Sequence, residues 1–287
     1  MSYYRPASLD QSLELLAAHE LTVVAGATDL YPACTTRSAW GDWRRSDLLD
    51  ISALEELRGI RDDGDCFRIG ALTTWTDLVA APLPGYFDTL KQAARNVGGV
   101  QIQNRATLVG NICNASPAAD GVPGLLCLNT EVELSSRTSK RILPLDRFIL
   151  GNRKTAIQPG EMVTALLIPK LPETAISGFE KLGARSYLVI SIVMVAGMLD
   201  LDTSGRIRQA RISIGACSPV ARRMTRLEQA LEGRQCEPGL EKLLLESHLE
   251  TLQPIDDVRS DAHYRRSAAM ELSRRLLASL SNAGVNV

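Results

Sequence analysis

The sequence has little that would point to nucleic acid, a membrane or secretion. Lys and Arg total 32 against 33 Asp and Glu, a formal net charge of −1, whereas nucleic-acid-binding domains usually show a basic excess. The longest largely apolar run, residues 187–199, is well short of the roughly 20 residues of a membrane span. The N-terminal residues lack the apolar core of a secretory signal. We therefore expect a cytoplasmic protein with no nucleic-acid partner and no membrane span.

Close pairs of metal-binding residues are also missing. Metal and iron–sulfur sites usually contain closely spaced cysteines, but no C-x-x-C pair occurs here. No histidine stands in a pattern typical of a nucleophile and its base, so Ser-His-Asp chemistry has little support. We predict no catalytic side chain and no metal site. The cysteines are expected to be reduced and mostly packed in the core: Cys34, Cys66, Cys113, Cys127, Cys217 and Cys236.

What the sequence does have is a row of short apolar runs followed by amphipathic ones. Strands are predicted at residues 21–25, 48–51, 67–71, 131–135 and 162–168, and a hairpin at 187–201 and 207–216. Helices are predicted after Ser8, at 90–97, and later at 220–231, 240–249 and 264–280. Residues 35–47 are expected to form an exposed loop. Because strands dominate early and helices late, the fold class is α+β, with a domain boundary within residues 169–178.

Residues 100–124 break this pattern. The stretch VQIQNRATLVGNICNASPAADGVPG is rich in small, amide and hydroxyl residues and has no amphipathic period. We expect an irregular segment, and a long irregular segment inside a compact domain is more often functional than not.

Two glycine-bearing segments are chemically suggestive, Val23–Leu30 and Thr107–Asn111. Each is expected to place a glycine where a strand meets a turn, so that successive main-chain N–H groups could bind an anion. Two such loops could hold a pyrophosphate between them. Turns use glycine for structural reasons as well, and neither the G-x-G-x-x-G nor the P-loop pattern occurs. Taken alone, each segment therefore also fits an ordinary turn.

Taken together, AGATDL and ATLVGNICNASPAAD resemble the FAD-binding medium subunit of the molybdenum hydroxylases, the family of xanthine dehydrogenase and bacterial carbon monoxide dehydrogenase. The resemblance covers nearly the whole chain, through EMVTALLIP, GFEKLGAR, RISIGACSPVARRMTRLEQAL and PIDDVRSDAHYRRSAAMELSRRLL. It implies an FAD-binding domain of the vanillyl-alcohol-oxidase/PCMH type, built from two α/β subdomains, at residues 1–172. A C-terminal domain of a small antiparallel sheet plus helices would follow at 173–287.

The resemblance also implies the residues that bind FAD. They are Val24, Ala25, Gly26, Ala27, Thr28, Asp29 and Leu30 in one pyrophosphate loop, Thr107, Gly110, Asn111, Ser116 and Asp120 in and after the other, and Val163, Lys181 and Tyr187 farther along. Asp120 falls where the family places a carboxylate on a ribose hydroxyl, and Tyr187 where a ring could stack on the flavin.

Plainer interpretations remain open for several of these residues. Asp120 could simply cap a helix, and Asn111 could satisfy loop backbone. Lys181 could be a solvated surface lysine, and Tyr187 could belong to the core. The C-terminal arginines are interpreted as the solvated face of a helix, with a docking surface as the alternative; they are Arg265, Arg266, Arg274 and Arg275.

The sequence departs from the family at two positions. Paired glycines are frequent in each loop, but here Ala27 and Val109 replace one of each pair. Val109 is expected to keep ordinary β dihedrals. A left-handed backbone conformation at Ala27 would cost roughly 1–2 kcal/mol of conformational free energy, and this cost could weaken FAD binding about tenfold. Gly26 and Gly110 are then the expected points of closest phosphate approach.

The implied function is electron transfer. FAD on this chain would take electrons from a small subunit carrying 2Fe-2S clusters and pass them to NAD+, oxygen or another acceptor, while a large subunit carries molybdopterin, in an (αβγ)2 assembly. The flavin supplies the redox chemistry and the protein positions it. Two alternatives remain: a non-catalytic scaffold with weak or lost FAD binding, and a free-standing flavin oxidase, which fits the C-terminal region poorly.

Overall fold

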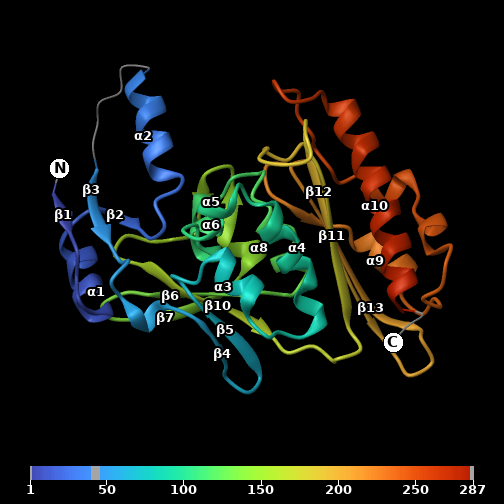
Figure 1. The fold of residues 1–287 in the computed structure, drawn as a ribbon, viewed down its shortest axis with the longest axis horizontal. Coiled ribbons are helices and arrows are strands. Elements are labelled where there is room, and N and C mark those ends of the chain that lie inside the picture. Colours follow the sequence, from blue (N-terminus) through green and yellow to red (C-terminus); the bar gives the residue numbers. More distant parts are fainter. Residues whose placement is uncertain (1, 40–45, 285–287) are drawn as a thin grey trace.

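The computed structural model describes residues 2–39 and 46–284, which form three layers side by side (Figure 1). An N-terminal parallel sheet lies at one end, a central antiparallel sheet with a layer of short helices follows, and a C-terminal antiparallel sheet with a long helix lies at the other end. This arrangement is of the α+β class, as the sequence predicts.

The N-terminal layer is a small parallel sheet in the order β1-β3-β2, with β1 at Tyr3–Tyr4, β2 at Leu21–Val24 and β3 at Asp47–Asp50. The predicted helix after Ser8 is confirmed as α1, Leu9–Ala18, with the Ser8 side chain accepting from the Gln11 N–H. The segment after β2 leads into α2, Leu30–Ala39. The prediction of a loop at residues 35–47 is wrong for 35–39, which continue α2, and for Asp47, which begins β3. Residues 40–45 lie outside the described residues.

The central sheet has the order β4-β5-β10-β6-β7, and all of its pairings are antiparallel. Its strands are β4 (Ile60–Asp62), β5 (Cys66–Gly70), β6 (Glu131–Ser135), β7 (Lys140–Pro144) and β10 (Met162–Pro169). The runs predicted as strands at 67–71, 131–135 and 162–168 are thereby confirmed. Around the sheet lie η1 (Glu55–Leu57), α8 (Leu145–Phe148), β8 (Ile149–Gly151) and β9 (Lys154–Thr155).

Short helices cover this sheet: α3 (Trp75–Ala80), η2 (Gly85–Phe87), α4 (Asp88–Asn96), α5 (Val100–Gln103), α6 (Leu108–Asn114) and α7 (Gly121–Cys127). The expectation of an irregular segment at residues 100–124 is wrong, because α5, α6 and the start of α7 fall within it. Helices this short are not stable by propensity alone. Packing stabilises α6 and α7, since neither has an exposed residue and every residue of α7 is buried.

The C-terminal sheet has the order β11-β12-β13-β14: β11 (Ile176–Leu182), β12 (Val193–Leu201), β13 (Ile207–Gly215) and β14 (Arg222–Arg223). The hairpin prediction is confirmed for β12 and β13, but residues 187–192 form a loop rather than strand. Beyond the sheet lie α9 (Thr225–Leu231) and α10 (Ala262–Gly284). The helix predicted at 240–249 is instead two 3₁₀ turns, η3 (Leu240–Leu243) and η4 (Glu246–Leu249), and 220–224 are not helical.

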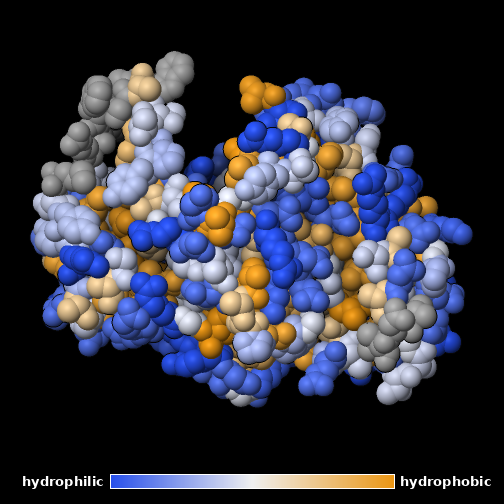
Figure 2. All heavy atoms as spheres, viewed as in Figure 1, coloured by the Kyte–Doolittle hydropathy of each residue, from blue (hydrophilic) through white to orange (hydrophobic). Residues whose placement is uncertain are grey.

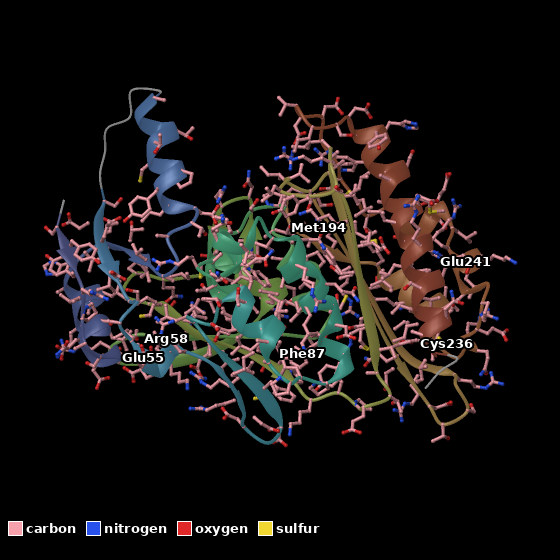
Figure 3. The ribbon with its side chains drawn as sticks, in the orientation of Figure 1. Glu55, Arg58, Phe87, Met194, Cys236 and Glu241 are labelled. Atoms are coloured by element: carbon pink, nitrogen blue, oxygen red, sulfur yellow. The ribbon has the colours of Figure 1, made fainter. Side chains whose placement is uncertain are left out.

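Strand β12 is apolar on both faces because it separates two cores. Phe87 and Met194, both labelled in Figure 3, belong to the core between the helical layer and the C-terminal sheet. The neighbouring residue Val193 belongs with Cys236 to the core under α10. Because side chains alternate along a strand, successive residues of β12 are buried on opposite faces.

The two parts of the chain meet along α4. The Ser177 hydroxyl accepts from the Thr89 N–H at 3.0 Å, and the Phe179 N–H donates to Gln92 Oε1 at 2.8 Å. Alternate residues of β11 therefore bond successive turns of the helix. The boundary at 172/173 remains a prediction, but the contact itself is continuous and well bonded.

Candidate functional site

A large cavity lies where the N-terminal and central layers meet. It has a volume of about 1010 Å³ and is lined by the end of β2, the segment that follows it, the start of α6 and residues 157–163. A second cavity of about 390 Å³ adjoins it and extends toward the C-terminal sheet. Both are lined by Thr28, Asp29, Val97, Ile102, Asn111 and Asn114, so they form one elongated cleft. In Figure 2 the outline is notched between α2 and the C-terminal sheet.

The first wall is the segment from Ala25 to Asp29, which joins β2 to α2. Within it Ala27 has a φ of 62°, in the left-handed region. None of the hydrogen bonds in the described part of the chain uses the main-chain N–H groups of residues 26–29. Unused N–H groups in a turn at the start of a helix form an anion-binding concavity. All residues of this segment line the large cavity.

Gly26 brings this segment into contact with the second one. A Cβ at Gly26 would lie 1.9 Å from the carbonyl oxygen of Arg105 and 3.1 Å from the Cα of Ala106. A side chain at this position is therefore excluded by backbone, which cannot move aside cheaply. The close approach that requires the glycine is between the two protein segments.

The second segment runs from Arg105 through the first turn of α6, which begins at Leu108. Thr107 is its N-cap, and its hydroxyl accepts from the Gly110 N–H at 2.9 Å. The expectation of a glycine where a strand meets a turn is therefore wrong for Gly110, because the threonine cap starts a helix. Val109 lies inside α6 and is buried, so its backbone is helical rather than extended.

Two buried polar atoms beside the cleft have no partner among the described residues. They are Oδ1 of Asn111, which lines both cavities, and Nε1 of Trp75, which lines the large one. Buried polar groups are nearly always hydrogen-bonded, so such atoms indicate a missing ligand or water. A ligand with both donors and acceptors would complement this part of the cleft.

The smaller cavity is bounded by a buried ion pair. Oδ2 of Asp120 lies 2.7 Å from Nζ of Lys181, and Oδ1 accepts from the Ser191 hydroxyl. The lysine also donates to the carbonyl oxygen of Asn96 at 3.0 Å. Burial raises the pKa of Asp120, and the lysine and serine oppose that shift.

These contacts decide two of the open interpretations. Asp120 precedes α7 as its N-cap residue, but its side chain makes no capping bond, so the capping interpretation is wrong. The side chain of Lys181 is only 8% exposed, so it is not a solvated surface lysine. Both residues link the central helices to the C-terminal sheet.

The remaining predicted residues lie at the edges of the cleft. Val163 is buried and lines the large cavity, and Ser116 lines the small one. Tyr187 is 60% exposed, so the interpretation as a core residue is wrong, and it is not among the described residues lining either cavity. The neighbouring Leu188 lines the small cavity and has a left-handed φ of 52°.

Sequence reasoning missed several residues of the site. Trp75, Ser191 and Arg153 line the cleft or hold a residue that does. Trp75 follows Thr74, whose capping box with Asp77 is a readable signal for the helix but not for the cleft. Ser191 and Arg153 carry no sequence signal, because their role depends on a fold that brings distant segments together.

The six cysteines are thiols and are not joined in disulfides; Cys127, Cys217 and Cys236 are buried, and the others are partly exposed. Burial raises the pKa of Cys113, Cys127 and Cys217 to about 12. Within residues 2–39 and 46–284 no group of three or more His, Cys, Asp or Glu residues could hold a metal ion. None of the helices in this same part of the chain is both long and apolar enough to cross a bilayer.

Two family profiles match most of the chain. The sequence profile described as "FAD binding domain in molybdopterin dehydrogenase" matches residues 1–171, and "CO dehydrogenase flavoprotein C-terminal domain" matches residues 179–280. The putative xanthine dehydrogenase FAD-binding subunit XdhB of Escherichia coli (strain K12) is 29% identical over 281 residues, 96% of this chain and 94% of that protein. The nicotine 6-hydroxylase medium subunit of Paenarthrobacter nicotinovorans is 27% identical over 279 residues, 96% and 95% of the two chains.

A solved structure is similar over the same length. A chain of carbon monoxide dehydrogenase from Hydrogenophaga pseudoflava, in a form lacking the Mo-pyranopterin moiety of the molybdenum cofactor, superposes with a TM-score of 0.88. The two share 25% sequence identity, and the match covers 99% of this chain and 98% of the other.

Proposed function

Because this chain belongs to the family of FAD-binding domains in molybdopterin dehydrogenases, we propose that its cleft binds FAD and that it works as the electron-transfer flavoprotein subunit of a molybdenum hydroxylase. The observation that carries the proposal is the pairing of two main-chain segments at one cavity. Gly26 packs against the backbone of Arg105 and Ala106, immediately before α6, and residues 25–29 and the first turn of α6 both line the large cavity.

The fit of this cleft to FAD rests on charge and hydrogen bonding. The unused N–H groups of residues 26–29 and the start of α2 suit a diphosphate, since both present partial positive charge. The unpartnered Oδ1 of Asn111 would accept from a donor on the ligand. The cavity of about 1010 Å³ is at the upper end of the usual range for small-molecule sites, as a dinucleotide requires.

The residues proposed to hold FAD are those that line the cleft or border it. The first segment, residues 24–30, with Thr107, Gly110 and Asn111, would bind the diphosphate. Ser116, Asp120 and Lys181 would form the end nearest the C-terminal sheet, and Val163 would contribute main chain. We retain Tyr187 as a residue of the rim, 60% exposed, available to cover a bound ring.

Bound FAD would supply one- and two-electron transfer. The chain's own part is to hold the cofactor, and the buried pair of Lys181 and Asp120, 2.7 Å apart, would border that end of the site. No side chain needs to act as an acid or base. We propose that electrons arrive from a small subunit with 2Fe-2S clusters, that a large subunit holds molybdopterin, and that NAD+, oxygen or another acceptor takes the electrons.

The first test is a titration of the purified chain with FAD, followed by quenching of flavin fluorescence. We expect saturable binding that inorganic pyrophosphate competes with, and much weaker binding of riboflavin, which lacks the diphosphate. Asn111→Ala should weaken FAD binding by about 1–3 kcal/mol, while Asn152→Ala, an exposed residue outside the cleft, should leave it unchanged.

The outcomes separate the proposal from the scaffold alternative. A chain that takes up no FAD even at high concentration is the scaffold. Equal binding of riboflavin and FAD would exclude the diphosphate site while leaving a flavin site. The assembly is tested separately by identifying co-purifying chains by mass and assaying them for molybdopterin and iron.

A further inference from the structure

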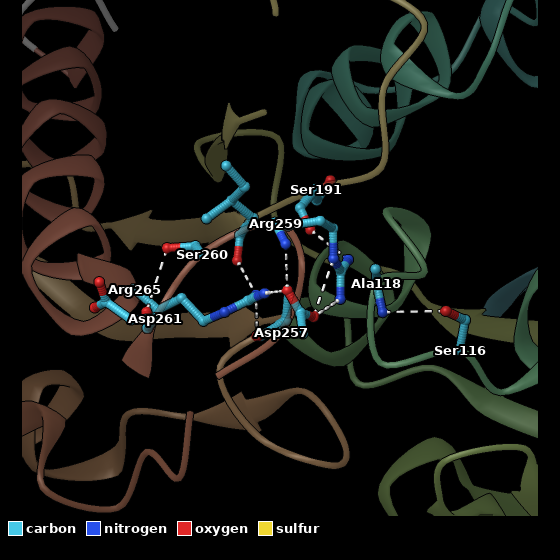
Figure 4. Close-up of polar contacts among 10 residues, drawn as sticks. Ser116, Ala118, Ser191, Asp257, Arg259, Ser260, Asp261 and Arg265 are labelled. Atoms are coloured by element: carbon cyan, nitrogen blue, oxygen red, sulfur yellow. Dashed lines mark hydrogen bonds and ion pairs between the residues drawn. The ribbon is translucent and has the colours of Figure 1, made fainter. Parts of the chain in front are cut away.

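The C-terminal domain contains a compact cluster of charged residues that the FAD proposal leaves without a role. It lies in the segment PIDDVRSDAHYRR, where the loop before α10 makes a tight turn. Asp257 and Ser260 exchange N–H···O bonds of 3.1 and 3.2 Å across that turn. The Asp257 carboxylate accepts from Arg259 Nε at 3.1 Å and from Arg265 Nη2 at 2.7 Å (Figure 4).

Both arginines then donate to main-chain carbonyls at the start of β12. Arg259 Nη1 bonds the carbonyl oxygen of Ser191 at 2.9 Å, and Arg265 Nη1 bonds that of Ile192 at 2.7 Å. The prediction that Arg265 lies on a solvated helix face is wrong, since its side chain is 1% exposed. The exposed Arg266, Arg274 and Arg275 do fit that prediction. Because Asp257 orients both guanidinium groups, two consecutive peptide groups are held in place.

Ser191 connects this cluster to the cleft. Ser191 is fully buried, and its hydroxyl donates to Asp120, the carboxylate that bounds the smaller cavity. Immediately before it, Leu188, Val189 and Ile190 line the same cavity. The Ile192 N–H bonds the Leu182 carbonyl at 2.8 Å, which closes residues 183–191 into a loop over this end of the cleft.

We propose that Arg259 is a positioning residue of the FAD site. By holding the Ser191 carbonyl it fixes the position of the 183–191 loop and so the direction of the Ser191 hydroxyl, and that hydroxyl keeps the Asp120 carboxylate oriented beside Lys181. Arg259 itself is not among the described residues lining either cavity, so it acts only through Ser191. This inference rests on the proposed function.

Arg259 is a better residue to replace than Arg265 in a test of this proposal. The Arg259 side chain is 30% exposed, so its replacement leaves no sealed void, whereas Arg265 is buried and also bonds the Ala216 carbonyl. The variant is Arg259→Gln. The matched control is Arg226→Gln, which removes an arginine paired with Glu250 at 2.7 Å in the same domain without a main-chain partner among the described residues.

The experiment measures FAD dissociation constants of the full chain by fluorescence quenching, in wild-type and Ser191→Ala backgrounds. R259Q should weaken FAD binding about tenfold, the scale of losing one hydrogen bond from a charged group, and R226Q should not change it. In the S191A background the effect of R259Q should shrink to less than about threefold, since contacts that act through one another are not additive. Arg259→Lys, which keeps the cation, should bind FAD more tightly than R259Q.

Two results would contradict the positioning role of Arg259. An unchanged FAD affinity in R259Q would overturn it, and so would an equal loss in both backgrounds, because Arg259 would then act by another route. If the wild-type chain binds no FAD, the proposed function fails on its own. Amide hydrogen exchange in the FAD-free chain then tests separately whether Arg259 holds the loop. R259Q should accelerate exchange in residues 183–192, and R226Q should not.

Discussion

The left-handed backbone at Ala27 gives a sharp prediction about where its energetic cost falls. The sequence suggests that an alanine in this position weakens FAD binding about tenfold. In the structure Ala27 has a φ of 62°, and its neighbour Gly26 packs against the Arg105 carbonyl. Because this contact is made by the protein itself, we expect the cost of the left-handed conformation to fall on folding and not on cofactor binding.

The magnitude follows from two opposing effects of Ala27→Gly. Glycine removes the penalty of the left-handed conformation, roughly 1–2 kcal/mol. It also widens the unfolded ensemble, which lowers the free energy of unfolding by about 0.4–1 kcal/mol. The net gain in stability is about 0.5–1 kcal/mol, and for a chain of this size the melting temperature should rise by about 2 °C. The FAD dissociation constant should change by less than about twofold.

The assay pairs thermal unfolding of the FAD-free chain with an FAD titration. Ala216→Gly is the matched control, because Ala216 has the same φ of 62° but lies outside the cleft, so it should show a similar stability gain. Ala25→Gly, in the same loop without a left-handed φ, should be destabilising. A tenfold tighter FAD complex in A27G with unchanged stability would refute the reasoning, since the loop would then adopt this conformation only on binding.

Three further substitutions test the packing around the cleft. Gly26→Ala places a Cβ 1.9 Å from a backbone oxygen, so thermal unfolding should show a loss of about 1–3 kcal/mol and FAD titration a weaker complex; normal values for both would contradict the contact. Glu228→Gln removes the charge of a buried carboxylate that accepts from Arg223 through both oxygens and should lower the unfolding free energy by about 3 kcal/mol, against less than about 1 kcal/mol for the exposed Glu250→Gln. Hydrogen bonds from two cations and a hydroxyl lower the pKa of the buried Glu133 to about 2 despite desolvation, so this carboxylate stabilises the fold above its unfolded pKa and loses that effect as pH falls from 4.5 to about 2. Glu133→Gln should flatten urea-measured stability over that window, and an unchanged slope would contradict it.

The sequence predicts the strands well because their signal is local. Residues 131–135 alternate charged and apolar side chains, residues 162–168 form a short apolar run with Val163, Thr164 and Ile168, and the two segments become β6 and β10. Pairing them with β5 in one antiparallel sheet requires contacts across long stretches of chain. The sequence therefore indicates the elements but not their order.

The helices beside the cleft could not be predicted from local sequence patterns. Residues 100–124 lack an amphipathic period, because no residue of α6 or α7 is exposed, so these helices have no solvated face to alternate with. The start of α6 is held by its neighbours, with the Leu108 N–H donating to the Thr73 carbonyl and the Trp75 N–H to that of Ala106. Likewise the buried Arg265 is paired with Asp257. The spacing of arginines along the helix does not reveal a partner that lies outside the helix.

The arrangement of α7 explains why the cleft depends on the C-terminal domain. At its N-terminal end Asp120 is held by Lys181 of β11 and by Ser191. At its C-terminal end Arg211 of β13 donates to the Cys127 carbonyl at 3.1 Å, a cation where the helix dipole favours one. A buried helix fixed at both ends by one domain cannot shift relative to it, so the wall of the smaller cavity moves only if the C-terminal sheet moves. A change in how that sheet is held, by a bound subunit or by a substitution, would therefore reach the FAD site through α7 and the 183–191 loop.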